Sequence, residues 1–130
     1  MIPRDVLIVD DTADCLIVMS AMLVANGYAV RCAESGPEAL GLIDARAPDV
    51  VLLDVMMPGM TGIEVLERLR GAHATARIPV IMITACIDDD DVLIGYQHGA
   101  DYYITKPCTA RQVMHGIALV CGDIDKASAA

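Results

Sequence analysis

Val50-Val51-Leu52-Leu53-Asp54 is an unbroken apolar run that ends in a carboxylate, and this stretch decides the fold. Three other apolar runs also end at polar side chains: residues 6–9 before Asp10 and Asp11, residues 80–83 before Thr84, and residues 102–105 before Lys106. In a parallel sheet the carboxyl ends of all strands meet at one edge. We therefore expect three carboxylates, one hydroxyl and one ammonium group to lie close together there.

Segments with a helical pattern separate the strands. We expect strands over residues 5–10, 28–32, 49–54, 78–83 and 101–105. We expect helices over residues 13–26, 35–46, 62–71, 88–98 and 108–121, with Arg70 on the solvent side of its helix. This alternation predicts an α/β fold whose parallel sheet is covered on both faces. The strand at 28–32 is more polar than the others, so we place it at an edge.

Length and composition predict one globular domain. The chain has 130 residues, of which 55% are hydrophobic, and we expect a domain over residues 1–122 with a flexible tail at 123–130. No apolar run approaches the ~20 residues that span a bilayer, and no signal peptide precedes the first strand. We therefore expect a cytoplasmic protein that does not contact membranes.

Charge and cysteine usage exclude two further classes of function. The net charge is −9, which argues against direct nucleic-acid binding, because phosphate contacts need clustered lysine and arginine. The cysteines form no Cys-x-x-Cys pair, so we expect free and mostly buried thiols, not a metal site or a disulfide framework. They are Cys15, Cys32, Cys86, Cys108 and Cys121.

The three carboxylates at the sheet edge favour a hard cation. Acids brought this close repel one another unless a cation joins them. Mg²⁺ prefers oxygen ligands, keeps several waters and often uses only one or two carboxylates. Asp11 and Asp54 could bind it directly, with Asp10 acting through water.

Asp54 is also a candidate nucleophile, because carboxylates form acyl phosphates in phosphoryl-transfer proteins. The incoming phosphoryl group needs its charge spread over fixed positive and hydrogen-bonding groups. Lys106 can supply a point charge, and the Thr84 hydroxyl can donate one hydrogen bond. The strand-end residues are therefore expected to support phosphoryl transfer.

Four stretches carry a family resemblance. They are Val6-Leu7-Ile8-Val9-Asp10-Asp11, Leu52-Leu53-Asp54-Val55-Met56-Met57-Pro58-Gly59-Met60-Thr61-Gly62, Pro79-Val80-Ile81-Met82-Ile83-Thr84-Ala85, and Gly99-Ala100-Asp101-Tyr102-Tyr103-Ile104-Thr105-Lys106-Pro107. With these motifs the chain resembles, from residue 5 to about 121, the receiver domain of two-component response regulators, including chemotaxis regulators. The resemblance implies a flavodoxin-like, doubly wound sheet of five strands in the order 2-1-3-4-5 with five helices, and our strand order rests partly on it.

The resemblance also implies roles for the site residues. Asp54 would accept a phosphoryl group from the phosphohistidine of a sensor histidine kinase or a histidine phosphotransfer protein. Asp10 and Asp11 would form the acidic pocket for Mg²⁺, with the backbone carbonyl of Met56 as a further ligand. Such a domain catalyses its own phosphorylation and dephosphorylation but is expected to turn over no external substrate.

A conformational switch is implied as well. Thr84 and Lys106 would contact the phosphoryl oxygens, and the ring of Tyr103 would turn inward as Thr84 moves toward the phosphate. This change would alter the surface formed by the helix at 88–98, the strand at 101–105 and the helix at 108–121, and so control a partner or output domain. The chain departs from the family at Cys108, where a bulky aromatic residue is usual.

Two other functions share parts of this pattern. A Mg²⁺-dependent phosphohydrolase with an aspartyl nucleophile also carries Asp, Thr and Lys at strand ends, but it places a second Asp two residues after the nucleophile. Here that position is Met56. A flavodoxin-like mononucleotide binder needs a phosphate-cradling loop after the first strand, where this chain has Asp10 and Asp11.

The helix at 13–26 has more apolar residues than a surface helix needs. Leu16, Met19 and Leu23 can face the core, which leaves Ile17 and Val24 outside. These are either scattered surface residues or a docking patch for a helical phosphodonor or a second copy of the chain. We therefore consider a homodimer through this helix or through the surface that includes the strand at 101–105.

Overall fold

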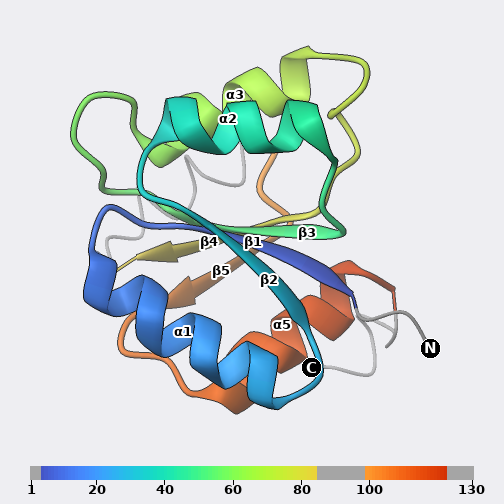
Figure 1. Ribbon diagram of the computed structural model, residues 1–130. Coiled ribbons are helices and arrows are strands. Elements are labelled where there is room, and N and C mark those ends of the chain that lie inside the picture. The colour runs from blue at the N-terminus through green and yellow to red at the C-terminus, as the bar shows by residue number, and fades with distance from the viewer. Residues whose placement is uncertain (1–3, 85–98, 123–130) are drawn as a thin grey trace.

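The computed structural model describes residues 4–84 and 99–122. Its five strands are parallel and form one sheet in the order β2-β1-β3-β4-β5, which confirms the predicted order (Figure 1). They are β1 (Asp5–Val9), β2 (Ala29–Ala33), β3 (Val50–Asp54), β4 (Val80–Thr84) and β5 (Tyr102–Thr105). The more polar strand β2 lies at an edge, as expected, and all five carboxyl ends point to the same side of the molecule.

Helices cover both faces of the sheet. In the described ranges they are α1 (Ala13–Ala25), α2 (Gly36–Ala45), α3 (Gly62–Gly71) and α5 (Ala110–Val120). Figure 1 shows α2 and α3 on one face and α1 and α5 on the other. The helix expected over 88–98 and the tail at 123–130 lie outside the described residues. None of the helices in the described ranges is long and apolar enough to cross a membrane.

Side-chain caps fix the start of three helices. The hydroxyls of Ser35, Thr61 and Thr109 accept hydrogen bonds from the backbone N–H groups of Glu38, Glu64 and Gln112. At Thr109 the cap is reciprocal, because the Gln112 side chain also accepts from the Thr109 N–H. The helix expected from residue 108 therefore begins at Ala110.

The sheet separates two apolar cores, as strand β1 shows. Successive side chains of a strand point to opposite faces. Val6 and Ile8 accordingly pack with α1 and α5, whereas Leu7 and Val9 pack with α2 and α3. All four side chains are buried, so the continuous apolar run before Asp10 is explained by burial on both faces.

Helix α1 is apolar on its outer face as well as its inner one. Leu16, Met19 and Leu23 are buried in the core, as predicted. Ile17 and Val24 are 67% and 57% exposed. The first turn carries a single acid, Asp14, and the last turn carries no basic residue. Helix α1 thus presents apolar side chains to solvent.

Arg70 does not lie on the solvent side of α3, contrary to our expectation. Its guanidinium donates to the carbonyls of Gly99, Ala76 and Ile78 and pairs with Asp101 over 2.8 Å. Arg70 lies in the last turn of α3, where a long side chain can extend past the helix end to reach loop carbonyls. The residue therefore ties α3 to the start of β4 and to the segment before β5.

The expectation of mostly buried thiols is wrong for the cysteines that the structure describes. Cys15, Cys32, Cys108 and Cys121 are only partly buried. Cys32 lies in the edge strand and Cys121 follows the end of α5, positions that the core covers on one side only. Cys86 lies outside the described residues.

Candidate phosphorylation site at the carboxyl edge of the sheet

The predicted site residues lie together at the carboxyl edge of the sheet. Asp54 is the last residue of β3 and Thr84 the last of β4, while Asp10 and Lys106 directly follow β1 and β5. The strand register aligns these ends, since Val9 pairs with Leu53 and Asp54 with Ile83. Asp10, Asp54 and Thr84 are buried.

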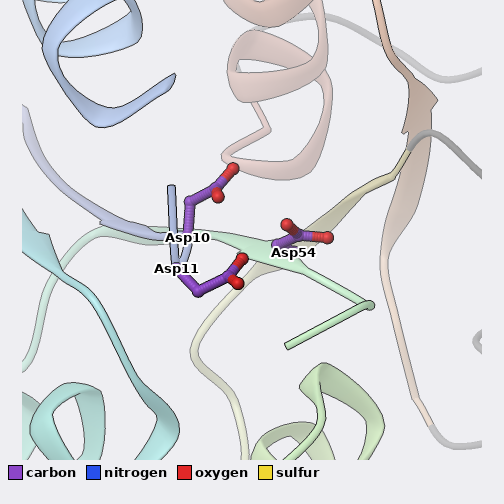
Figure 2. Close-up of side chains that lie close together, drawn as sticks. All are labelled: Asp10, Asp11 and Asp54. Carbon is purple, nitrogen blue, oxygen red and sulfur yellow. The ribbon is translucent and has the colours of Figure 1, made fainter. Parts of the chain in front are cut away.

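Three carboxylates form a compact cluster at this edge. Figure 2 shows Asp10 and Asp11 at the end of β1 beside Asp54 at the end of β3. One carboxylate oxygen from each lies within 4.8 Å of the others. Asp11 is exposed, whereas Asp10 and Asp54 are buried. The cluster is therefore open to solvent on the Asp11 side.

Lys106 is the cation that faces this cluster. Its Nζ donates to Oδ2 of Asp10 over 2.7 Å and to Oδ2 of Asp54 over 3.3 Å. The Lys106 side chain is 22% exposed, and the Lys106–Pro107 peptide bond is cis. One ammonium group is thus paired with two buried carboxylates. Buried charges need such a partner, because burial without one is energetically costly.

Backbone N–H groups hold the other oxygen of each buried carboxylate. The Thr12 N–H donates to Oδ1 of Asp10 over 2.9 Å, and the Met56 N–H donates to Oδ1 of Asp54 over 3.0 Å. Both bonds span two residues, as in Asx turns. They fix each carboxylate so that Oδ2 faces the ammonium group.

Burial dominates the electrostatics of Asp54. Burial raises the pKa of the Asp54 carboxyl, and repulsion from Asp10 raises it further. The hydrogen bond from the Met56 N–H and the charge of Lys106 lower the pKa, but they do not cancel the rise. Burial alone would lower the pKa of Lys106. The hydrogen bond to Asp10 and the attraction of Asp54 outweigh it, so the pKa of Lys106 lies above its ordinary value. The site therefore carries negative charge that one lysine does not fully offset.

Gly62 is a supporting residue that sequence reasoning missed. A Cβ at this position would collide with the backbone carbonyl oxygen of Asp54 and with Cα of Val55. The Gly62 N–H donates to the Val55 carbonyl over 3.1 Å. Helix α3 therefore begins directly against the segment that carries Asp54. In the sequence, Gly62 stood out only as the last residue of the stretch 52–62 that carries the family resemblance.

The predicted switch residues lie beside this site in β4 and β5. Thr84 is fully buried. The Tyr103 side chain packs against the core on the α2 and α3 side, and its register partner in β4 is Met82. The Met56 side chain is 62% exposed, so only its backbone takes part in the site.

Comparison with known proteins identifies the class. Residues 6–118 match the family model of the response regulator receiver domain, and the chain belongs to this family. It is a receiver domain of two-component signalling, and such domains are signalling modules, not classical enzymes. The phosphohydrolase alternative is not favoured.

Particular relatives agree with this assignment. The chain is 40% identical over 114 residues to the phosphate regulon transcriptional regulatory protein PhoB of Pseudomonas aeruginosa, covering 88% of this chain but only 50% of that protein. It is similar to a putative response regulator from Chloroflexus aurantiacus, with 32% identity, a TM-score of 0.88, and coverage of 92% of this chain and 98% of the other. A CheY-like receiver domain protein from Methanospirillum hungatei is 28% identical with a TM-score of 0.86, and the match covers 93% and 95% of the two chains.

Proposed function

We propose that Asp54 is the phosphoacceptor and that it takes its phosphoryl group from a phosphohistidine on a sensor histidine kinase or a histidine phosphotransfer protein. The observation that carries this proposal is the position of Asp54 at the end of β3, buried, with Oδ2 3.3 Å from Lys106 Nζ. In the transfer, a carboxylate oxygen of Asp54 attacks phosphorus, the new O–P bond forms and the P–N bond to histidine breaks. The electron pair of the P–N bond leaves with the imidazole.

Each neighbour of Asp54 has a role in this step. Lys106 offsets the charge on the phosphoryl oxygens from a fixed position, which lowers the barrier without reorganisation. Thr84, at the end of the adjacent strand β4, would donate a hydroxyl hydrogen bond. The Met56 N–H keeps the Asp54 carboxylate oriented. No other protein group is needed, because positioning and charge stabilisation supply most of the catalysis in phosphoryl transfer.

The acidic cluster fits Mg²⁺. Its three oxygen donors lie within 4.8 Å of one another, and the side of Asp11 is open to solvent. Asp11 and Asp54 would bind the ion directly, the Met56 carbonyl would be a further ligand, and Asp10 would act through water. When bound, the ion neutralises charge on the phosphoryl oxygens. Hard oxygen donors with room for waters are what Mg²⁺ prefers.

Phosphorylation would change the neighbouring surface. A phosphoryl group adds about −1.5 to −2 charge and three acceptor oxygens. Thr84 would move toward it and the Tyr103 ring would follow inward, because both residues belong to the paired strands β4 and β5. The surface of the segment at 88–98, β5 and α5 would then control a partner or an output domain.

The remaining assignments concern the setting of the domain. We place the receiver domain at residues 1–122 and in the cytoplasm, with no contact with nucleic acid and no turnover of an external substrate. A homodimer would form through α1, whose residues Ile17 and Val24 are exposed, or through the surface that includes β5 and α5. The chain spans half the length of PhoB.

The test is the intact mass of the protein after incubation with Mg²⁺ and acetyl phosphate. Wild type should gain one phosphoryl group in a Mg²⁺-dependent reaction, and Asp54→Ala should gain none. Asp44→Ala, which removes an exposed acid on α2, should be phosphorylated like wild type. A phosphoryl adduct on Asp54→Ala would refute the assignment, and rapid phosphate release from unrelated monoesters would favour a hydrolase.

A further inference from the structure

A groove of about 470 Å³ runs between α1 and the segment that follows β5, next to the phosphorylation site. Helix α1 contributes Asp14, Cys15, Val18, Met19 and Met22, and the segment after β5 contributes Lys106, Pro107 and Cys108. Four of these eight side chains carry sulfur. Lys106 belongs to both the groove and the acidic cluster, so the two sites share one wall.

The spacing of the sulfur residues places them together. Cys15, Met19 and Met22 stand at i, i+4 and i+7 and so form one stripe along α1. Cys108 faces this stripe from the other wall and packs in the same apolar cluster as Met19 and Met22. Burial is the main cause that raises the pKa of the Cys108 thiol, and the nearby Cys15 thiol adds to it. Cys15 and Cys108 thus line the same groove from its two walls.

Core packing alone does not account for this arrangement. Methionine and free cysteine often fill irregular gaps inside apolar cores, but a filled gap leaves no open volume. Here the four sulfur side chains surround a groove that opens to solvent beside Val18, which is 60% exposed. Cys15, Met22 and Cys108 are only partly buried, and all three line the groove.

We propose that this sulfur-lined groove is a binding site for a soft monovalent metal ion, Cu(I), with the thiolates of Cys15 and Cys108 as its main ligands and the thioethers of Met19 and Met22 beside them. Thiolate and thioether donors select Cu(I) over hard cations, whereas carboxylates select Mg²⁺. The fold thus holds two sites of opposite ligand type on either side of Lys106.

Charge and proton balance agree with a cuprous ion. Coordination deprotonates a thiol outright, so binding releases two protons and leaves a net charge of −1 on the two thiolates and the ion. Lys106 also lines the groove, while its ammonium group donates to Asp10 and Asp54.

The experiment is an anaerobic titration of the full chain with Cu(I) against a colorimetric cuprous chelator, with Mg²⁺ present throughout. Wild type should retain one Cu(I) per chain, and Cys15→Ser and Cys108→Ser should each bind it more than about tenfold more weakly. The matched controls Cys32→Ser and Cys121→Ser remove partly buried thiols outside the groove and should bind as wild type does. Asp54→Ala should also bind normally, so this result is independent of the proposed phosphorylation.

A second measurement needs no variant and so does not depend on how each variant folds. Wild-type protein with and without Cu(I) is alkylated with iodoacetamide, and the modified cysteines are mapped by peptide mass. Copper should protect Cys15 and Cys108 and leave Cys32 and Cys121 reactive. The proposal would be overturned if wild type failed to retain Cu(I) against the chelator. It would also be overturned if copper protected Cys32 and Cys121 as strongly as Cys15 and Cys108.

Discussion

The ammonium group of Lys106 lies 2.7 Å from Oδ2 of Asp10, although 96 residues separate the two along the chain. The parallel sheet produces this contact, because β1 and β5 both end at the same edge. The same ammonium group lies 3.3 Å from Oδ2 of Asp54. A change in charge at Lys106 should therefore alter the electrostatics of the Asp54 carboxylate.

Substitution of Lys106 should slow phosphorylation. In Lys106→Met the phosphoryl oxygens lose a fixed positive charge, and we expect the rate of modification by acetyl phosphate to fall by about 10²–10³-fold, as for loss of one charge-stabilising donor elsewhere. Initial rates by intact mass provide the measurement. Arg68→Met removes an exposed cation from α3 and should leave the rate unchanged. A wild-type rate in Lys106→Met would show that the lysine has no part in transfer.

The raised pKa of Asp54 makes stability depend on pH. Since burial raises it, the folded state holds this proton more tightly than the unfolded state does. This contribution favours folding below the unfolded-state pKa, about 4, and declines as pH rises through the folded-state pKa. Without Mg²⁺, Asp54→Asn should therefore melt at a higher temperature than wild type near pH 7.

The stabilisation by Asp54→Asn should shrink as the pH falls toward 4, because wild-type Asp54 then becomes protonated. Asp44→Asn, on the exposed side of α2, serves as the control and should show little effect at either pH. Thermal unfolding followed by circular dichroism between pH 3.5 and pH 8 gives both curves. If the melting temperatures of Asp54→Asn and wild type differed by the same amount at every pH, the electrostatic explanation would be contradicted.

Mg²⁺ should stabilise the folded protein through the acidic cluster. A ligand that binds only the folded state adds about 2.7 kcal/mol to the free energy of unfolding at a concentration of 100 Kd. We expect this stabilisation in wild type and its loss in Asp11→Ala, which removes the exposed carboxylate of the cluster. Asp44→Ala should respond to Mg²⁺ as wild type does. Thermal melts across a Mg²⁺ titration provide the measurement. If Mg²⁺ stabilised Asp11→Ala as much as wild type, the ion would bind elsewhere.

Gly62→Ala should destabilise the protein and disturb Asp54. The added Cβ meets the backbone carbonyl of Asp54, and overpacking of this kind costs about 1–3 kcal/mol. Gly41→Ala is the matched control, because a Cβ there meets nothing within 4 Å and alanine favours the helix by about 1 kcal/mol. Urea unfolding compares the two variants. If Gly62→Ala were as stable as Gly41→Ala, the close approach of α3 to Asp54 would not be a constraint.

The sequence predicted which side chains meet at the sheet edge, because Asp10, Asp54, Thr84 and Lys106 each mark the end of an apolar strand. The apolar runs before Asp10, Asp54, Thr84 and Lys106 fixed both the strands and the edge at which they meet. The contact between Lys106 and Asp10 then follows from the strand order. The strand order itself rested partly on family resemblance, since the apolar runs alone do not determine which strands are neighbours.

The features that the sequence did not reveal depend on contacts between segments. Helical periodicity placed Arg70 outside, but its position in the last turn of α3 lets it reach the carbonyls of Ala76, Ile78 and Gly99. The constraint at Gly62 arises only because α3 begins against the end of β3. The partial exposure of Cys32 follows from its place in an edge strand, which the hydrophobicity of cysteine does not indicate.

Chemical trapping of the acyl phosphate tests the central claim most directly. The phosphorylated protein is reduced with borohydride, which converts an aspartyl phosphate to homoserine, and its peptides are mapped by mass. We predict homoserine at position 54 in the Mg²⁺-dependent product and unmodified aspartate at positions 10 and 11. Homoserine at position 10 or 11, or a phosphorylated product with aspartate intact at position 54, would contradict the assignment of Asp54 as the phosphoacceptor.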